Sequence, residues 1–395
     1  MRFLLFLTLL IISMPLYCNP ISEPYIEITS DQRSVITFIL RAKEPNSKVR
    51  ILSEIESMEI NIDTIGNRYS IDSNGKPVRL YGKIAEIFCA FMSITDINIS
   101  NNPYLEILNC SNNDLTELHT SNNRNLRILD CSVNKITSLD LKNNIKLEEF
   151  YCFRNRLEEL DLSNNHLLTC LNCDDNHIQS LNLKNNNELS ILACGRNLIS
   201  ILDINHLNNL KILEISDNQI TEINLRNNPK LERLDVDNLN LNRIDVSENK
   251  VLKNLFCSNN NLTQIDLTEL YLLEIFHCEN NKLGNLNLLY NKNLEKISCS
   301  DNLLESIDIS PLVNLTDFWC KNNQLKSIDF TNNRKIKWVN LSGNKDLSSI
   351  ELHYFGTDKF GEYYNQLEGF TLIDTNLNKI FRTKLKKKLQ EKIMI

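Results

Sequence analysis

The chain contains twelve cysteines and six histidines, the side chains best suited to bind a transition metal or to act as nucleophiles. Four of them fall at a spacing that superficially suits zinc: His166, Cys170, Cys173 and His177. On an extended strand, residues three apart point to opposite faces, so Cys170 and Cys173 cannot share one ion. We therefore expect no metal site here.

Most of the cysteines follow a fixed period. Ten of them recur on multiples of 21 residues: Cys89, Cys110, Cys131, Cys152, Cys173, Cys194, Cys257, Cys278, Cys299 and Cys320. The same count places Ile215, Val236 and Leu341 where a cysteine is missing. A position that accepts all four residue types behaves as a small apolar pocket. We expect reduced, buried thiols, because stacked strands hold neighbouring Cβ atoms side by side rather than facing each other. Cys170, outside this column, is expected to be exposed and reactive.

The 21-residue period extends beyond the cysteines. Residues 126–141 read LRILDCSVNKITSLDL, which gives the frame LxxLxCxxNxLxxLxL, and an Asn-rich turn follows. Thirteen such repeats start between positions 84 and 336. A fixed period this short predicts a solenoid in which each coil contacts only its neighbours. Leu129 and Cys131 are two apart and should point inward from one strand, while Asp130 points outward.

This frame resembles the 21-residue cysteine-ladder repeats of internalin-J-like bacterial surface proteins, which are leucine-rich-repeat proteins. The resemblance covers residues 84–352, about two thirds of the chain. It implies a mostly β solenoid, a right-handed array of about 13 coils with a parallel concave sheet and gentle curvature. A small N-terminal β cap and a short C-terminal cap should close its ends.

An asparagine follows the ladder position by three residues, as Asn134 does, where the strand must bend. Eleven of the thirteen coils have it, and Met92 and Leu239 are the exceptions. The amide can bond backbone groups of its own and the neighbouring coil that would otherwise be buried and unpaired. We expect looser bends at the two exceptions. On the opposite side of the coil, the alternation of residues 139–141 predicts extended backbone.

The segment before the repeats predicts a leader and a cap. Residues 1–18 have a positive start and an apolar run typical of a secretory signal peptide, too short to span a bilayer. Lipidation of Cys18 is the alternative, although Tyr17 stands where a lipobox has a small residue. Residues 19–83 are expected to form a β-rich cap or, alternatively, a separate binding domain. Its strands should lie near 25–29, 35–41, 49–53, 59–63, 69–72 and 77–81, with a hairpin turn at 73–76.

The segment after the repeats, residues 353–395, predicts a C-terminal cap with a basic tail. The apolar residues of 376–395 fall near one helical face. The tail is expected to be a helix that closes the last coil, or a basic amphipathic helix in weak contact with an anionic surface.

The sequence carries no motif of an enzyme, since it has no Gly-rich phosphate loop, HExxH motif or nucleophile elbow. We expect no catalytic residue, no cofactor and no nucleic-acid partner. Outward strand positions should form columns on the concave face, with an acidic middle between aromatic patches. The residues expected to bind a protein ligand are Tyr151, Phe153, Arg154, Glu214, Asp235, Asp237, Phe256, His277, Trp319 and Trp338.

These observations predict a secreted or cell-envelope protein that binds other proteins in the manner of an adhesin. Two alternatives stay open. The array could be a structural envelope scaffold without a specific ligand, or a secreted effector that acts on host proteins.

Overall fold

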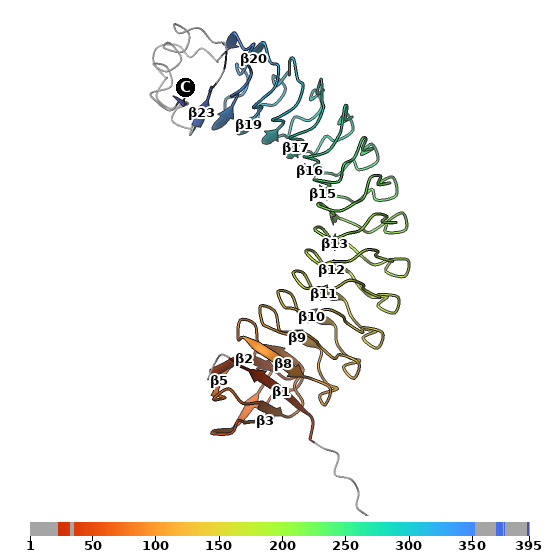
Figure 1. Ribbon diagram of the computed structural model, residues 1–395, viewed down its shortest axis with the longest axis vertical. Coiled ribbons are helices and arrows are strands. Elements are labelled where there is room, and N and C mark those ends of the chain that lie inside the picture. The colour runs from red at the N-terminus through yellow and green to blue at the C-terminus, as the bar shows by residue number, and fades with distance from the viewer. Residues whose placement is uncertain (1–22, 32–34, 352–368, 374, 376–392, 395) are drawn as a thin grey trace, which may run out of the picture.

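The computed structural model of the chain is an arc of stacked coils with a β-rich cap at its N-terminal end (Figure 1). The structure describes residues 23–31, 35–351, 369–373, 375 and 393–394. Short strands line the inner side of the arc, and looped segments form its outer side. The solenoid and the concave sheet predicted from the 21-residue period are therefore confirmed. Within the described residues, no helix has the length and apolar character needed to cross a bilayer.

Each of the thirteen coils contributes one strand to the concave sheet. The strands are β7 (Glu86–Phe88), β9 (Ile107–Asn109), β10 (Ile128–Asp130), β11 (Glu149–Tyr151), β12 (Cys170–Asn172), β13 (Ile191–Ala193), β14 (Ile212–Glu214), β15 (Arg233–Asp235), β16 (Asn254–Phe256), β17 (Ile275–His277), β18 (Lys296–Ser298), β19 (Asp317–Trp319) and β21 (Trp338–Asn340). All are parallel, and each residue pairs with the one 21 positions later, as Leu129 does with Phe150. Each repeat position therefore forms a straight column across the coils.

The N-terminal cap closes the first coil on both of its faces. On the concave side, β2 (Val35–Arg41) pairs antiparallel with β7, and β5 (Asn67–Asp72) pairs with β2. On the convex side, β8 (Ile94–Asn98) of the first coil pairs with the cap in a sheet whose other strands are β1 (Tyr25–Ser30), β6 (Val78–Tyr81), β3 (Ser47–Leu52) and β4 (Ser57–Ile62). The cap thus covers the strand edge that an open first coil would expose.

The six strands expected in this segment lie within two residues of β1 to β6. The hairpin expected at residues 73–76 does not form. Asn74 and Gly75 have the positive φ values of a tight turn, 48° and 72°. However, β5 pairs with β2 while β6 pairs with β1 and β3, so the turn links two sheets instead of two paired strands.

The concave sheet continues beyond the thirteenth coil. β23 (Gly369–Thr371) pairs in parallel with β21, and β24 (Ile393–Met394) pairs with β23. On the convex side, β20 (Ser327–Asp329) pairs with β22 (Ser349–Glu351). A helix was expected over residues 376–395, but Ile393–Met394 form a strand. The rest of that expected helix lies outside the described residues, as do residues 1–18 with Cys18.

The ladder cysteines line the core as the repeat predicts. All ten are free thiols and fully buried, and Ile215, Val236 and Leu341 occupy the same column. Burial raises the pKa of the Cys89 thiol to about 12 and also raises the pKa of Cys131, because the thiolate would lose its hydration. Cys170 corrects an expectation: its side chain is only 8% exposed, and burial raises the pKa of its thiol as well.

The predicted asparagine column satisfies buried backbone groups of two coils at once. Asn155 is typical: its Nδ2 donates to the carbonyls of Cys131 and Cys152, both at 3.0 Å. Its Oδ1 accepts from the backbone N–H of Ile136, also at 3.0 Å. One side chain therefore joins its own coil to the preceding one through three hydrogen bonds.

The two coils without this asparagine have a different bend. In the other repeats one residue, immediately before the asparagine, has a positive φ, as Val133 does at 54°. The bend at Met92 has two such residues, Phe91 and Ser93, and the bend at Leu239 has Asn238 and Asn240. The two bends therefore differ from the others in backbone conformation, and their expected looseness stays a prediction.

A second asparagine column, in the Asn-rich turns, is also buried. Its members are Asn102, Asn123, Asn144, Asn165, Asn186, Asn228, Asn249, Asn291 and Asn333. Asn144 Nδ2 donates to the carbonyls of Thr120 at 3.1 Å and of Asn123 at 2.9 Å, both in the preceding coil. The sequence shows that the turns are Asn-rich, but the burial of one asparagine in each of these nine turns was not predicted.

Histidine replaces asparagine at one break of this second column. Leu207 occupies the asparagine position there and cannot donate a side-chain hydrogen bond. The adjacent His206 places its Nε2 2.9 Å from the carbonyl oxygen of Leu183, which corresponds to the Thr120 carbonyl that Asn144 bonds. His206 therefore carries its proton on Nε2 in this contact.

The buried column predicts how the thiols react. We expect the ladder cysteines to resist a maleimide in the native protein and to react on unfolding, and Cys170 to react slowly. Cys131→Val should cost less than about 1.5 kcal/mol, because the pocket already accepts Val236. Cys131→Asp should prevent stable folding, because it buries a carboxylate without a partner. Mass spectrometry of labelled protein and thermal unfolding check both expectations. Native labelling at several ladder positions would contradict them.

Candidate functional site

The concave face presents the outward columns that the sequence predicts. The register places one column directly before the ladder: Phe88, Asn109, Asp130, Tyr151, Asn172, Ala193, Glu214, Asp235, Phe256, His277, Ser298, Trp319 and Asn340. Since strands of a sheet are about 4.8 Å apart, Tyr151 on β11 and Phe256 on β16 lie roughly 24 Å from each other. The predicted residues therefore form separate groups along one face.

The middle group joins acidic and aromatic residues through a cation. Phe256 and His277 pack edge to face with ring centroids 5.0 Å apart. The guanidinium of Arg233 lies 4.5 Å from the centroid of the Phe256 ring, and its Nε is 2.5 Å from a carboxylate oxygen of Glu214. Arg233, which lies on β15 two residues before Asp235, was not among the residues predicted from the sequence. The 21-residue repeat gives the column in which Arg233 lies, but it does not show the contacts of Arg233 with Glu214 and Phe256.

The two tryptophans lie closer to the C-terminal end of the sheet. Trp338 on β21 is 42% exposed, and Trp319 on the neighbouring strand β19 is half-buried. The buried Ser298 separates Trp319 from His277 in their common column. The aromatic patch expected over Phe256, His277, Trp319 and Trp338 is thus divided into two pairs.

The N-terminal group is smaller and more polar. The hydroxyl of Tyr151 donates to Glu149 at 2.9 Å, and burial beside Cys170 and Glu149 raises the pKa of Tyr151. Phe153 is half-buried, while Arg154 is exposed and forms an ion pair with Asp175 at 3.5 Å. These partners leave less free apolar surface here than around the tryptophans.

The acidic middle contains carboxylates that are hard to ionise. Burial raises the pKa of Asp174 to about 6, and burial together with the neighbouring Asp235 raises that of Asp237 to about 7. Both accept a short backbone hydrogen bond, Asp174 from Gly195 and Asp237 from Ser258, each at 2.5 Å. Burial also lowers the pKa of His277, which keeps its ring neutral near pH 7. The charge of this face therefore changes between mildly acidic and neutral pH.

The four residues with zinc-like spacing, His166, Cys170, Cys173 and His177, do not share one location in the coil. Cys173 lies in the core column and Cys170 on the concave side, and His166 Nδ1 is 3.3 Å from the carbonyl oxygen of Asn185. In the described part of the chain, no three His, Cys, Asp or Glu side chains are grouped as metal ligands.

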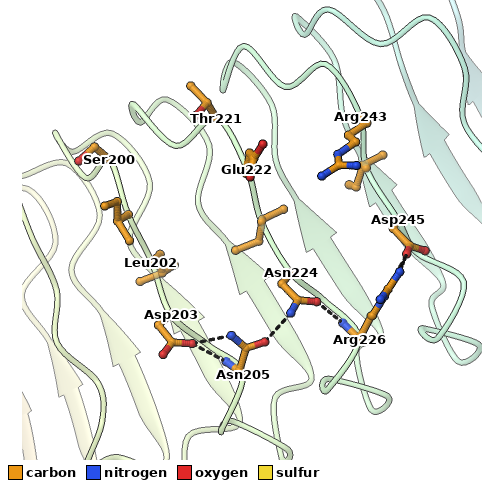
Figure 2. A pocket seen from close by; sticks show the side chains of 13 residues that line it. Ser200, Leu202, Asp203, Asn205, Thr221, Glu222, Asn224, Arg226, Arg243 and Asp245 are labelled. Atoms are coloured by element: carbon orange, nitrogen blue, oxygen red, sulfur yellow. Dashed lines mark hydrogen bonds and ion pairs between the residues drawn. The ribbon is translucent and has the colours of Figure 1, made fainter.

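A groove of about 680 Å³ crosses the convex side of three coils between Ser200 and Asp245 (Figure 2). Polar groups form a hydrogen-bonded line along it, with bonds of 2.7 to 3.2 Å, in which the backbone N–H of Arg226 donates to the Asn224 side chain: Asp203, Asn205, Asn224, Arg226 and Asp245. Because these groups satisfy one another, the line offers few free partners to a ligand. This groove was not predicted from the sequence.

A scan against models of protein families gives no match for this chain, and a sequence comparison with curated proteins gives no significant match. By structure, the chain is similar to the functional domain of InlJ from Listeria monocytogenes, which includes a cysteine ladder. The TM-score is 0.59 and the identity 27%, covering 76% of this chain and 71% of that one. A leucine-rich-repeat protein of Leptospira interrogans has a TM-score of 0.64 at 18% identity, covering 75% and 86% of the two chains.

A third similar structure is the leucine-rich-repeat ectodomain of the receptor kinase GASSHO1/SCHENGEN3 from Arabidopsis thaliana, in complex with Casparian strip integrity factor 2. Its TM-score is 0.52 at 18% identity, covering 71% of this chain and 42% of that one. The repeat frame, the parallel concave sheet and the column of free thiols agree with these comparisons. The chain is a leucine-rich-repeat protein built from 21-residue repeats, with a cysteine ladder like that of InlJ.

Proposed function

We propose that this chain is an exported, adhesin-like protein that binds a protein partner through the C-terminal half of its concave face. The observation that carries the proposal is the cluster on β14 to β17, where Glu214 holds Arg233 over the ring of Phe256, which packs edge to face with His277. The tryptophans on β19 and β21 extend this surface. Aromatic residues and arginine are the side chains most enriched among energetic anchors of protein interfaces.

The sheet presents these side chains with little ordering cost. Every strand from β14 to β19 is paired on both sides, so the backbone that carries the cluster is fixed before a partner arrives. Within this surface, binding then has to order side chains and little backbone, which limits the conformational part of the entropy cost.

The partner surface should be basic. Asp235 and Asp237 lie beside the aromatic cluster, and Glu214 is half-exposed there. Carboxylates around an aromatic centre steer a positively charged protein and make its association sensitive to salt. A partner rich in arginine and lysine would also stabilise the ionised form of Asp237.

Export is supported by the sequence of residues 1–18 and is compatible with the thiols. An oxidising compartment threatens free cysteines. In the described residues, the ladder thiols are fully buried, and burial raises the pKa of several of them well above the usual range of a thiol. Such thiols seldom form the reactive thiolate. The similar plant receptor ectodomain is in complex with a factor, which supports a binding role for an array of this kind.

The first prediction separates the binding face from the core. Trp319→Ala should weaken binding of the partner at least about tenfold, because an aromatic anchor contributes about 2 kcal/mol or more. The melting temperature of the Trp319→Ala variant should change little. The neighbouring Phe318 points into the core and is fully buried, so Phe318→Ala should cost about 3–5 kcal/mol of stability. A pull-down with the immobilised array identifies the partner, and titration of each variant gives its affinity.

Tyr290→Ala is the matched control, since Tyr290 is an exposed aromatic residue outside the strands of the concave sheet. It should bind the partner normally. The assignment of the face is wrong if Tyr290→Ala loses binding while Trp319→Ala keeps it. A full set of concave variants without any effect would favour a structural scaffold.

The second prediction concerns pH. Asp237 is protonated below its pKa of about 7, so affinity for an arginine-rich partner should rise between about pH 5.5 and pH 8 as the carboxylate ionises. The folded-state pKa of Asp237 is raised above the pKa of an aspartate in the unfolded chain. Asp237 therefore contributes to folding stability below the unfolded-state pKa, and this contribution is lost as the pH rises through about 7. Asp237→Asn should flatten both curves.

Asp308→Asn is the control for this experiment. Hydrogen bonds from Ser310 lower the pKa of Asp308, so this carboxylate stays ionised throughout the same range. Both pH curves should keep their wild-type slope in that variant. An unchanged slope in Asp237→Asn would show that another group controls the pH dependence.

A further inference from the structure

A second groove, of about 500 Å³, lies where the N-terminal cap meets the first coils. Its lining includes Lys43, Lys83, Tyr104, Glu106, Arg127 and Lys146. The lining contains four cationic side chains and two carboxylates, in a chain whose net charge is −7. Its volume falls in the range of small-ligand sites. The groove thus has a local excess of positive charge, whereas the whole chain has a net negative charge.

Two of the four cations are already paired. Lys43 binds Glu106 at 2.8 Å, and Arg127 binds the carboxylate of Glu148 through two hydrogen bonds of 3.0 and 2.8 Å. Lys83 and Lys146 have no carboxylate partner within the part of the chain that the structure describes. Their charges are therefore available to an anion.

The free lysines belong to one column along the edge of the coils. Successive coils place Lys83, Tyr104, Asn125 and Lys146 at the same repeat position. The Lys83 ammonium lies 5.2 Å from the centroid of the Tyr104 ring, and Lys146 donates to Asn125 Oδ1 at 2.8 Å. Tyr104 is 44% exposed, so part of its ring remains open to a ligand. Along this column, successive coils therefore present a lysine, an aromatic ring, an amide and a second lysine.

We propose that this groove binds an anionic polysaccharide, with Lys83 and Lys146 contacting its sulfate or carboxylate groups and Tyr104 packing against a sugar ring. Lysine ammonium groups pair readily with such anions, and an aromatic face suits the apolar side of a sugar. Ser47 and Asn125 supply groups that can bond hydroxyls. An extended chain suits the site better than a compact anion, because the two lysines lie three coils apart along an open edge.

An acidic peptide is the competing ligand, and the lining favours it less. Peptides commonly bind by adding a strand to a free sheet edge or by filling apolar pockets. The concave strands beside the groove, β7 and β9, are paired on both sides. Most of the lining is polar, with Ala85 and Tyr104 as the apolar contributions. This site is remote from Phe256 and does not depend on the protein-binding role proposed above.

The experiment uses a matched pair of lysines. Lys230 occupies the same repeat position as Lys146 and makes the same contact, donating to Asn209 Oδ1 at 2.8 Å. It lies outside the groove. Lys146→Gln and Lys230→Gln therefore remove the same charge and the same type of hydrogen bond from the full chain, and only the first changes the proposed site.

The probes are a fluorescent heparin-derived hexasaccharide, a hexamer of galacturonate, a neutral dextran oligomer and a polyglutamate peptide. We expect one or both anionic sugars to bind and the dextran and the peptide to bind much more weakly. Lys146→Gln should weaken sugar binding about tenfold, the effect of losing one charge-assisted hydrogen bond. Lys230→Gln should bind as the wild type does. Tyr104→Ala should also weaken binding, and Tyr104→Phe should largely retain it.

Three results would overturn the proposal. Failure of both anionic sugars to bind excludes the ligand class. Equal losses in Lys146→Gln and Lys230→Gln would place binding elsewhere, for example on the basic tail of residues 376–395, of which the structure describes only residues 393–394. Polyglutamate that binds as tightly as the sugars would identify an acidic peptide as the ligand. The variants change exposed side chains, so their melting temperatures should match the wild type and confirm that each is folded.

Discussion

The array depends on one constraint, which is that the bends of each coil bury backbone groups that no strand can pair. Asparagine meets this constraint because its amide both donates and accepts. At Asn155 the three bonds reach two coils, and at Asn144 two bonds reach the preceding coil. The fixed 21-residue period follows from this, since inserting one residue would move an amide away from the carbonyls it must meet. The two coils without the first asparagine pass through a second residue with positive φ.

Much of the structure could be predicted because columns follow directly from the period. Once residue 129 pairs with residue 150, the repeat alone gives the neighbours of every outward side chain within its column. What could not be predicted depends on side-chain direction and on neighbours in adjacent columns. Cys170 was expected to be exposed, yet it lies buried beside Tyr151. Arg233 was missed because its importance comes from Glu214 and Phe256 together, not from its own position in the frame.

The same period separates the surfaces of the molecule. The concave face carries carboxylates around aromatic rings, with Asp237 poised to ionise near neutral pH. The edge next to the cap carries Lys83 beside Tyr104 and, further along, Lys146, and neither lysine has a carboxylate partner among the described residues. An acidic site and a basic site can coexist on this rigid stack, because backbone and asparagine hydrogen bonds fix the position of each coil relative to the next. We expect a basic protein at the first site and an anionic sugar at the second.

The central claim is that asparagine side chains hold each coil to its neighbour and so fix the faces that bind. Hydrogen exchange at the Leu157 amide, which donates to Asn176 Oδ1 at 3.0 Å, tests it most directly. In Asn176→Ala, this amide and those of the adjacent coils should exchange much faster. The Leu283 amide, held in the same way by Asn302 at 3.0 Å, should keep its wild-type rate, because each coil contacts only its neighbours. Unchanged exchange at Leu157 in the variant would contradict the account.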